Sequence, residues 1–228
     1  MPVFNGFSKE LPKYYQHLKK NNSKQWFEKH HNEYEEFMLV PAREFVVEMG
    51  ERLRKIAPGI NAVPKINQSL FKINRDVRFS KDKSPYKTNM GIWFWEGRRK
   101  RMECSGFYFQ LEDRKLLFGT GFYMFPKNLL TLYRNAVVDK KLGLELTKAV
   151  KKVSGKGYQV NGKYYKRVPQ GYDADHPNAE FLLYNGLHAM VEEKIPQAFY
   201  SQALIDYAFA HYKNMLPLHR WLLNVMNN

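Results

Sequence analysis

The residues best suited to chemistry lie in a strongly basic stretch near the middle of the chain. Residues 65–101 contain eleven Lys or Arg against three Asp or Glu, a net charge of +8, whereas the whole chain of 228 residues carries +15. Inside this stretch the sequence RDVRFSKDKSPYK, residues 75–87, alternates cations with hydroxyls and is too polar for a core strand. Arginine pairs with phosphate or carboxylate through two parallel hydrogen bonds, lysine adds a point charge, and serine hydroxyls with loop amides complete an anion cradle. The stretch therefore predicts an anion-binding loop.

The predicted ligand-binding side chains of this loop are five cations and one carboxylate that can orient them. They are Arg75, Asp76, Arg78, Lys81, Lys83 and Lys87. Because the spacing Arg-Asp-x-Arg favours pairing over free exposure, we expect Arg75 or Arg78 to be partly buried against an acid, with the basic run at the mouth of a groove. The alternative is a solvated, charge-rich loop in which Arg75 and Asp76 pair for structural reasons alone. Neither a Walker sequence nor a dinucleotide-binding fingerprint occurs here, so a bound phosphate would be held in another way.

A second polar block follows the dipeptide Asn161-Gly162, which is typical of a type I′ hairpin turn. Because a hairpin aims its ends accurately, we predict that Arg167 or Tyr172 approaches Arg75, Arg78 or Lys81 closely enough to share a ligand or a carboxylate. Asp173 or Asp175 would then offset the repulsion between cations. The alternative is that this block simply caps the following helix.

Other polar groups are weaker candidates for metal binding or catalysis. Asp173, Asp175 and His176 are metal-ligand types, but no second cluster with recognisable spacing accompanies them, so we predict no metal and no cofactor. His211 and His219 lie eight residues apart on one predicted helix, where a half-buried, hydrogen-bonded histidine is commoner than an acid–base catalyst. No G-x-S-x-G elbow and no H-E-x-x-H helix occurs, which disfavours a serine hydrolase and a zinc protease.

Aromatic residues 93–95, followed by the basic residues 98–101, allow two interpretations. Aromatics interleaved with cations are what single-stranded nucleic-acid surfaces use for stacking and phosphate contact. A strand, however, must turn one of its two faces inward, so we expect part or all of this aromatic run to belong to the core.

An α+β fold must position these residues. Apolar spacings of three to four predict one helix from Ser8 to Lys20, a second from Asn22 that Pro41 interrupts, and a third from Pro41 to Ile56. From Lys65 the period changes towards two, which predicts short strands at 66–73, 92–95, 107–111 and 116–118, with a turn at 112–114. Further helices are predicted at 126–137, 142–153, 179–184 and 199–226, and a further strand at 188–192. We therefore predict an antiparallel sheet, built as a meander plus a hairpin and packed by N-terminal and C-terminal helices.

Length and composition bound the class of protein. With 44% hydrophobic and 15% aromatic residues, 228 residues suffice for one sizeable core, so we predict a single domain over residues 1–228. The single cysteine, Cys104, cannot form a disulfide framework and is expected to be a buried structural thiol. No apolar run approaches the roughly 20 residues that cross a bilayer, and the residues MPVFNGFSKELPKYY lack the basic flank, apolar stretch and cleavage site of a secretory signal, so we expect a cytoplasmic protein without a membrane partner.

The run RDVRFSKDKSPYK resembles the signature of a bacterial and fungal family known as domain of unknown function 2461. Further blocks resemble the family in the same order and cover most of the chain: FNGFSKELPKYYQHLKKNNSKQWFEKHHNEY, CSGFYFQLED, LLFGTGFYMFPKNLLTLYRNAV and YKRVPQGYDADHPNAEFLLYNGL. One departure is Gly119-Thr120-Gly121, where the family tends to a run of glycines. The resemblance implies a shared globular fold and points to those blocks; it implies no activity, cofactor or catalytic residue.

Three hypotheses of function follow. The first is a protein that binds an anionic, phosphate-bearing ligand through the basic loop, nucleic acid being the leading candidate. The alternative is an enzyme acting on a small phosphorylated or carboxylated substrate, in which Asp76 or a histidine is the base and Arg75 and Arg78 hold the anion. The third is a structural or interaction module, in which the basic loop serves only to keep the protein soluble. A flat stripe of cations would favour the first, and a deep pocket with a carboxylate among arginines the second.

Overall fold

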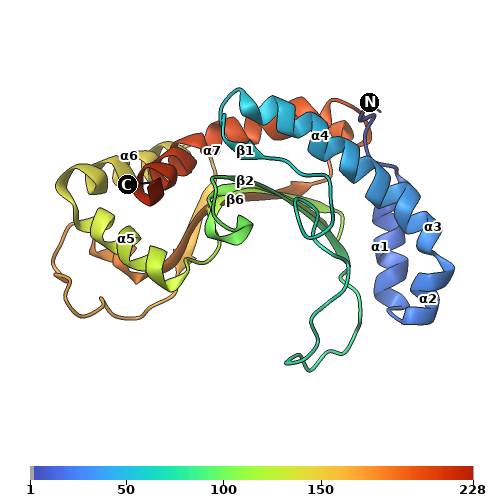
Figure 1. Cartoon of the computed structure of the whole chain (residues 1–228), viewed down its shortest axis with the longest axis horizontal. Coiled ribbons are helices and arrows are strands. Elements are labelled where there is room, and N and C mark those ends of the chain that lie inside the picture. Colours follow the sequence, from blue (N-terminus) through green and yellow to red (C-terminus); the bar gives the residue numbers. More distant parts are fainter. Residues whose placement is uncertain (1–2, 228) are drawn as a thin grey trace. The chain divides into compact units, whose positions relative to one another are not determined.

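The computed structural model describes residues 3–227 and confirms the predicted α+β class. One antiparallel sheet of six strands has the order β1-β2-β3-β4-β6-β5 (Figure 1). Its strands are β1 (Ile60–Asn61), β2 (Asn89–Glu96), β3 (Gly106–Glu112), β4 (Lys115–Phe122), β5 (Gln159–Lys163) and β6 (Tyr184–Lys194). The helices are α1 (Glu10–Lys20), α2 (Lys24–Lys29), α3 (His31–Tyr34), α4 (Val40–Arg54), α5 (Lys127–Val138), α6 (Lys140–Ser154) and α7 (Leu204–Asn227). Four shorter turns are the π-helical η1 (Glu35–Leu39) and the 3-10 turns η2 (Arg101–Glu103), η3 (Ala179–Leu183) and η4 (Gln197–Tyr200).

The chain forms two compact units, each assembled from separate segments. Unit 1 comprises the residues up to Phe94, Tyr108–Phe118 and Glu192–Ala210. Unit 2 comprises Trp95–Phe107, Gly119–Val191 and the residues from His211 on. Strands β2, β3, β4 and β6 and helix α7 each begin in one unit and end in the other. The single domain predicted for residues 1–228 stays a prediction.

The core of unit 1 is built from phenylalanines that are distant in the sequence. Phe7 stacks on Phe199 with ring centroids 4.9 Å apart, and Phe45 of α4 packs on Phe109 of β3 at 5.1 Å. Burying an aromatic ring of this size removes a large apolar area from water. These contacts fix the N-terminal helices against the part of the sheet that belongs to unit 1.

The core of unit 2 forms around the second part of α7. Tyr212 packs on Phe107 of β3 with ring centroids 5.1 Å apart. The Trp221 indole donates a hydrogen bond of 2.8 Å to the Leu142 carbonyl of α6, so a buried polar group finds its partner. The last part of α7 is thereby joined to both the sheet and α6 of the same unit.

The aromatic run at 93–95 is part of the core, as the strand argument expects. Trp93, Phe94 and Trp95 are all buried in β2. Their rings therefore cannot serve as a stacking surface for nucleic acid. Within residues 3–227, no helix combines the length and the hydropathy that crossing a bilayer requires.

Two predictions about the N-terminal helices are wrong in detail. Pro41 does not interrupt the second helix, because it occupies the first turn of α4, where a missing N–H group is tolerated. The preceding turn η1 is π-helical, and the Val40 amide donates to the Glu35 carbonyl five residues back. The second helix also does not start at Asn22: Ser23 caps α2 and accepts from the Trp26 amide, so the Asn22 side chain is available for another contact.

The hairpin predicted at Asn161-Gly162 is also wrong. Both residues lie within β5, which pairs antiparallel with β6, and the register shifts between Asn161 and Lys163 as in a β-bulge. Gly162 has a φ of 129°, and a Cβ atom there would lie 2.0 Å from the Gly186 carbonyl oxygen. Glycine is therefore required for close backbone approach inside the sheet, not for a turn between strands.

The turn predicted between the third and fourth strands is confirmed. Asp113 and Arg114 join β3 to β4 with φ values of 46° and 61°. Two consecutive positive φ angles are the signature of a tight type I′ connection, whose twist matches that of the flanking strands.

Candidate anion-binding loop

The basic loop, defined here as residues 72–87, lies between β1 and β2 in unit 1 and extends away from the sheet (Figure 1). Its two sides pair at the base. The Arg75 amide donates to the Pro85 carbonyl at 2.8 Å, and the Lys87 amide donates to the Ile73 carbonyl at 2.7 Å. Ile73 is buried at this base, so the loop has a packed attachment and a solvent-exposed tip.

The N-terminal helices hold the base of the loop through Tyr86. The Asn22 side-chain amide donates to the Tyr86 carbonyl at 2.9 Å, and its oxygen accepts from the Tyr86 amide at 3.0 Å. The Phe27 ring stacks on the Tyr86 ring with centroids 4.3 Å apart. The two polar contacts reproduce the pairing of a neighbouring strand, so this half of the loop base has its backbone hydrogen bonds satisfied.

Arg75 closes the neck of the loop by an ion pair with Asp82. Its side chain is 26% exposed, and it also donates to the Ser84 carbonyl at 3.3 Å. Hydrogen bonds from the Ser84 hydroxyl and amide, together with that from Arg75, lower the pKa of Asp82 to about 2. The expected partial burial of Arg75 against an acid is confirmed, with Asp82 as the partner instead of Asp76.

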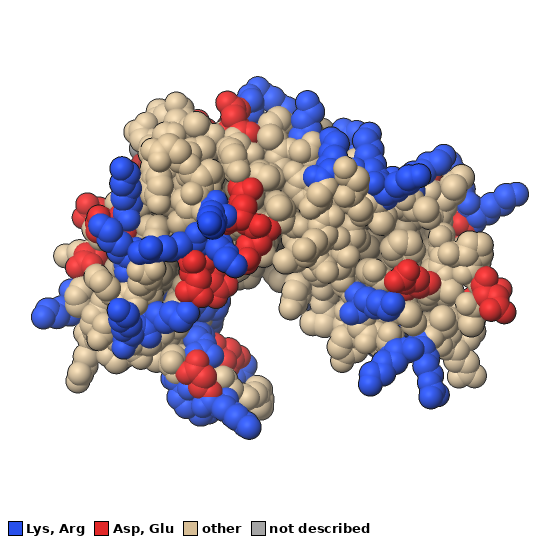
Figure 2. All heavy atoms as spheres, turned by 180° about the vertical axis from the view of Figure 1, so that it is seen from behind, with Lys and Arg blue, Asp and Glu red and all other residues tan. Residues whose placement is uncertain are grey.

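The tip of the loop, residues 76–81, contains a turn in which the Ser80 amide donates to the Val77 carbonyl at 3.3 Å. Arg78 and Phe79 occupy the two central positions of this turn, from which side chains project outward. Arg78 pairs with Asp76 through bonds of 3.0 Å and 2.7 Å, and these hydrogen bonds lower the pKa of the Asp76 carboxyl. Figure 2 shows cationic and acidic side chains together on this loop.

Two lysines of the loop, Lys81 and Lys83, pair with no carboxylate among the described residues 3–227. Lys83 donates to the Val77 carbonyl at 3.0 Å and Lys87 to the Lys72 carbonyl at 3.0 Å. Lys81 is exposed and makes no hydrogen bond or ion pair with any residue in the described range 3–227. Positive charge that the carboxylates of the loop do not neutralise therefore lies on Lys81 and Lys83.

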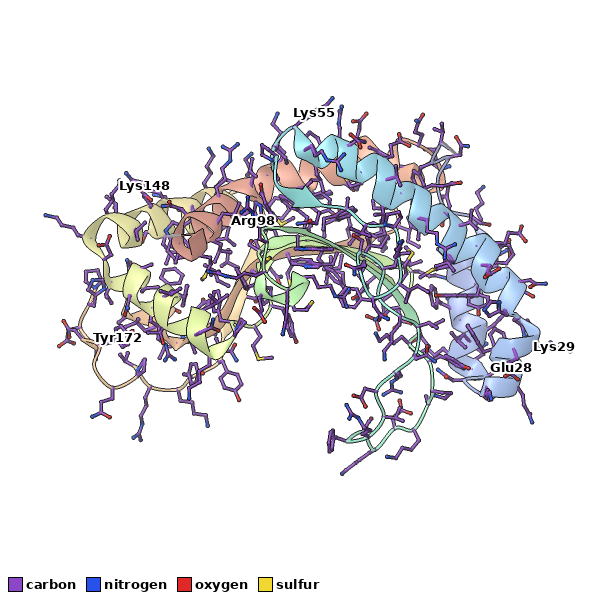
Figure 3. The ribbon with its side chains drawn as sticks, in the orientation of Figure 1. Glu28, Lys29, Lys55, Arg98, Lys148 and Tyr172 are labelled. Atoms are coloured by element: carbon purple, nitrogen blue, oxygen red, sulfur yellow. The ribbon has the colours of Figure 1, made fainter. Side chains whose placement is uncertain are left out.

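The second predicted block, which carries Arg167 and Tyr172, belongs to unit 2. Tyr172, labelled in Figure 3, donates a hydrogen bond of 2.7 Å to the Asn135 side chain of α5. Arg167 is exposed. Because the basic loop belongs to unit 1, the predicted convergence of these two residues on it stays a prediction.

Local capping accounts for the remaining polar residues of this block. The Asp173 carboxylate accepts from the Asp175 amide at 2.9 Å, and His176 Nδ1 accepts from the Asn178 amide at 3.1 Å, just before η3. These are ordinary turn and capping contacts of Asx and His side chains. Within residues 3–227 no three His, Cys, Asp or Glu side chains gather as metal ligands would.

A buried polar network in unit 2 surrounds His219, for which the sequence favours a hydrogen-bonded structural histidine but indicates no partners. His219 of α7 is 1% exposed; its Nε2 lies 2.8 Å from Glu96 Oε2 and its Nδ1 lies 2.8 Å from Ser105 Oγ. Because a carboxylate can only accept, Nε2 carries the proton and Nδ1 accepts from the Ser105 hydroxyl. Burial lowers the pKa of His219, outweighing the opposing effect of Glu96, so the imidazole is neutral at pH 7.

This network satisfies hydrogen bonds that a buried histidine, serine and carboxylate would otherwise lack, and it joins α7 to the β2–β3 connection of unit 2. No spacing in the sequence marks it, because its members lie at positions 96, 105 and 219. Cys104 is buried beside it, as expected, and burial raises the pKa of its thiol. Arg98, labelled in Figure 3, lines a small pocket with Glu96 and Ser105.

Together the fold and its projecting, cation-rich basic loop define the class as an α+β protein. The chain belongs to the family described as conserved hypothetical protein (DUF2461), whose sequence profile matches residues 10–221. The comparison with curated proteins and the comparison with solved structures found no match.

Proposed function

We propose that this protein binds a polyanion through the basic loop, and that nucleic acid is the leading candidate. The observation that carries the proposal is the charge distribution along the basic loop. Two arginines are neutralised by carboxylates of the loop, whereas Lys81 and Lys83 meet no carboxylate within residues 3–227. Cations that are exposed and spaced along a loop suit a chain of phosphates better than a single small ligand.

The alternative, an enzyme with a small anionic substrate, has less support. A general base at neutral pH needs a carboxyl pKa raised towards 7. Hydrogen bonds lower the pKa of both Asp76 and Asp82 instead, so each carboxylate of the loop is a poor proton acceptor. Both carboxylates act here as partners that orient arginines.

The proposed ligand-binding set includes Arg75, Asp76 and Arg78 as oriented groups and Lys81, Lys83 and Lys87 as the main phosphate contacts. Arg167 and Tyr172 are proposed as further contacts from unit 2. If they share the ligand, Arg167→Ala should weaken binding without a change in the stability of the fold, because Arg167 is exposed. Unchanged affinity in this variant would remove unit 2 from the proposal and leave the loop in place.

A salt titration tests the proposal. Binding of a labelled oligonucleotide should weaken steeply as salt rises, because each neutralised phosphate releases counterions. The triple variant Lys81→Ala, Lys83→Ala and Lys87→Ala should reduce the slope of log K against log salt by about 2 to 3. A matched control removes the same charge from exposed lysines of α6: Lys148→Ala, Lys151→Ala and Lys152→Ala. Absence of binding at low salt contradicts the proposal, as does an equal effect of both triple variants.

A further inference from the structure

Phe79 is the most exposed large apolar side chain among residues 3–227. Its exposed fraction is 96%, compared with 78% for Tyr123 and 69% for Tyr164. A phenylalanine gains nothing from this position in the free protein, because its ring lies in water instead of in the core. Its site in the outer turn of the basic loop is therefore a reason to look for a partner that covers the ring.

Cationic residues both precede and follow Phe79 in the sequence. The Arg78 guanidinium lies 5.8 Å from the centre of the Phe79 ring, within the range of a cation–π contact. Lys81 and Lys83 follow two and four residues later, and both are exposed. An aromatic ring flanked by cations in this way offers one face for stacking and several charges for the backbone that carries the stacked group.

The turn and the neck of the loop hold the ring outward. The Ser80 amide donates to the Val77 carbonyl, which places Phe79 at a central position of the turn. The ion pair of Arg75 and Asp82 closes the neck just behind it. The tip is thus a short closed segment, so part of the entropy cost of presenting the ring is met before any ligand binds.

We propose that Phe79 stacks on an unpaired base of single-stranded nucleic acid while Arg78, Lys81 and Lys83 contact the adjoining phosphates. This inference rests on the proposed polyanion binding and names its substrate class. A base in a duplex is already stacked on both faces, whereas an unpaired base offers its face to an aromatic ring at little cost.

A lipid surface would also attract a phenylalanine among cations, but the tip suits it less well. Stable attachment to a bilayer needs a broader apolar surface than one ring supplies. The neighbours of Phe79 within the tip are Arg78, Ser80 and Lys81, and these polar residues do not extend the apolar surface of the ring. The charge pattern matches a strand of phosphates with bases between them.

The experiment compares two probes that carry the same phosphates. One is a labelled oligothymidylate of about 12 nucleotides, a length typical of single-strand sites, and the other is an abasic strand of equal length. The wild-type chain should bind the oligothymidylate more tightly. Phe79→Ala should lose about 5- to 150-fold on the oligothymidylate and little on the abasic strand, because stacking is lost and charge is kept.

Two further variants serve as controls. Phe79→Trp should retain the preference, and its indole fluorescence should be quenched on binding the oligothymidylate but not the abasic strand. Tyr123→Ala, at another exposed aromatic side chain, should leave both affinities unchanged. Because Phe79 is exposed, its replacement should not alter the thermal transition.

The outcomes separate this inference from the proposed function. Equal wild-type affinity for both strands would overturn stacking and leave polyanion binding intact. Failure of the wild-type chain to bind either strand would overturn both. The inference would also be refuted if the wild-type chain bound anionic vesicles, Phe79→Ala weakened that binding, and the two strands bound equally well. Phe79 would then contact a lipid surface instead of a base.

Discussion

Replacing His219 by alanine is expected to cost more stability than any other single histidine substitution in this chain. The variant removes a 1% exposed imidazole and leaves the Ser105 hydroxyl and the Glu96 carboxylate without that partner. A hydrogen bond between neutral groups contributes about 0.5–1.5 kcal/mol, and one to a charged group about 1.5–3 kcal/mol. Adding the cavity left by the ring, we expect a loss of about 3–5 kcal/mol in the free energy of unfolding.

Urea unfolding at pH 8 measures this loss, because His219 is neutral in both states at that pH. Ser105→Ala is the matched control: it removes one hydrogen bond and creates almost no cavity, so it should cost about 1 kcal/mol. Tryptophan fluorescence, to which Trp221 on the same helix contributes, follows the unfolding. A loss below about 1 kcal/mol for His219→Ala would show that water replaces the imidazole and that the network does not hold α7 in place.

Three further predictions follow from single contacts. Because burial lowers the pKa of His219 in the folded state, the unfolded state binds the proton first, and wild-type stability should fall as pH drops below about 6.5, a slope that His219→Gln should reduce in urea titrations. Asn22→Ala removes both hydrogen bonds to Tyr86, so amides of the basic loop should exchange faster with deuterium by about 5- to 100-fold, while equal rates would mean that the Phe27 stacking alone holds the base. Gly162→Ala places a Cβ against a carbonyl oxygen at an unfavourable φ and should lower the thermal transition clearly, whereas an unchanged transition would contradict the bulge geometry.

The elements that the sequence predicts well are those whose signal is local. The turn at Asp113-Arg114 and the burial of at least part of the aromatic run at 93–95 follow from alternation and turn preference within a few residues. The Asn161-Gly162 dipeptide has the same local signal as a hairpin turn. Its actual conformation, a bulge within β5, is set by pairing with β6, which lies far along the sequence. A glycine that permits close approach of two strands and one that permits a turn look alike in the sequence.

The candidate site shows the same limit. The charge run and the pairing of Arg75 were predictable, because cations and acids alternate within one short segment. The choice of Asp82 as partner depends on the loop folding back on itself, which the spacing does not reveal. The network depends on α7 packing beside the β2–β3 connection, which brings together Ser105 and His219, 114 residues apart in the sequence, so no local pattern could indicate it.

The interrupted segments of the two units constrain how this chain can fold during synthesis. Unit 1 needs the strand segment Tyr108–Phe118 and the segment Glu192–Ala210 in addition to its N-terminal residues. A nascent chain that ends near Phe94 therefore lacks Phe109 and Phe199, two of the rings that form its core. Unit 1 must wait until most of the chain has left the ribosome, and no single proteolytic cut can release it as one continuous fragment.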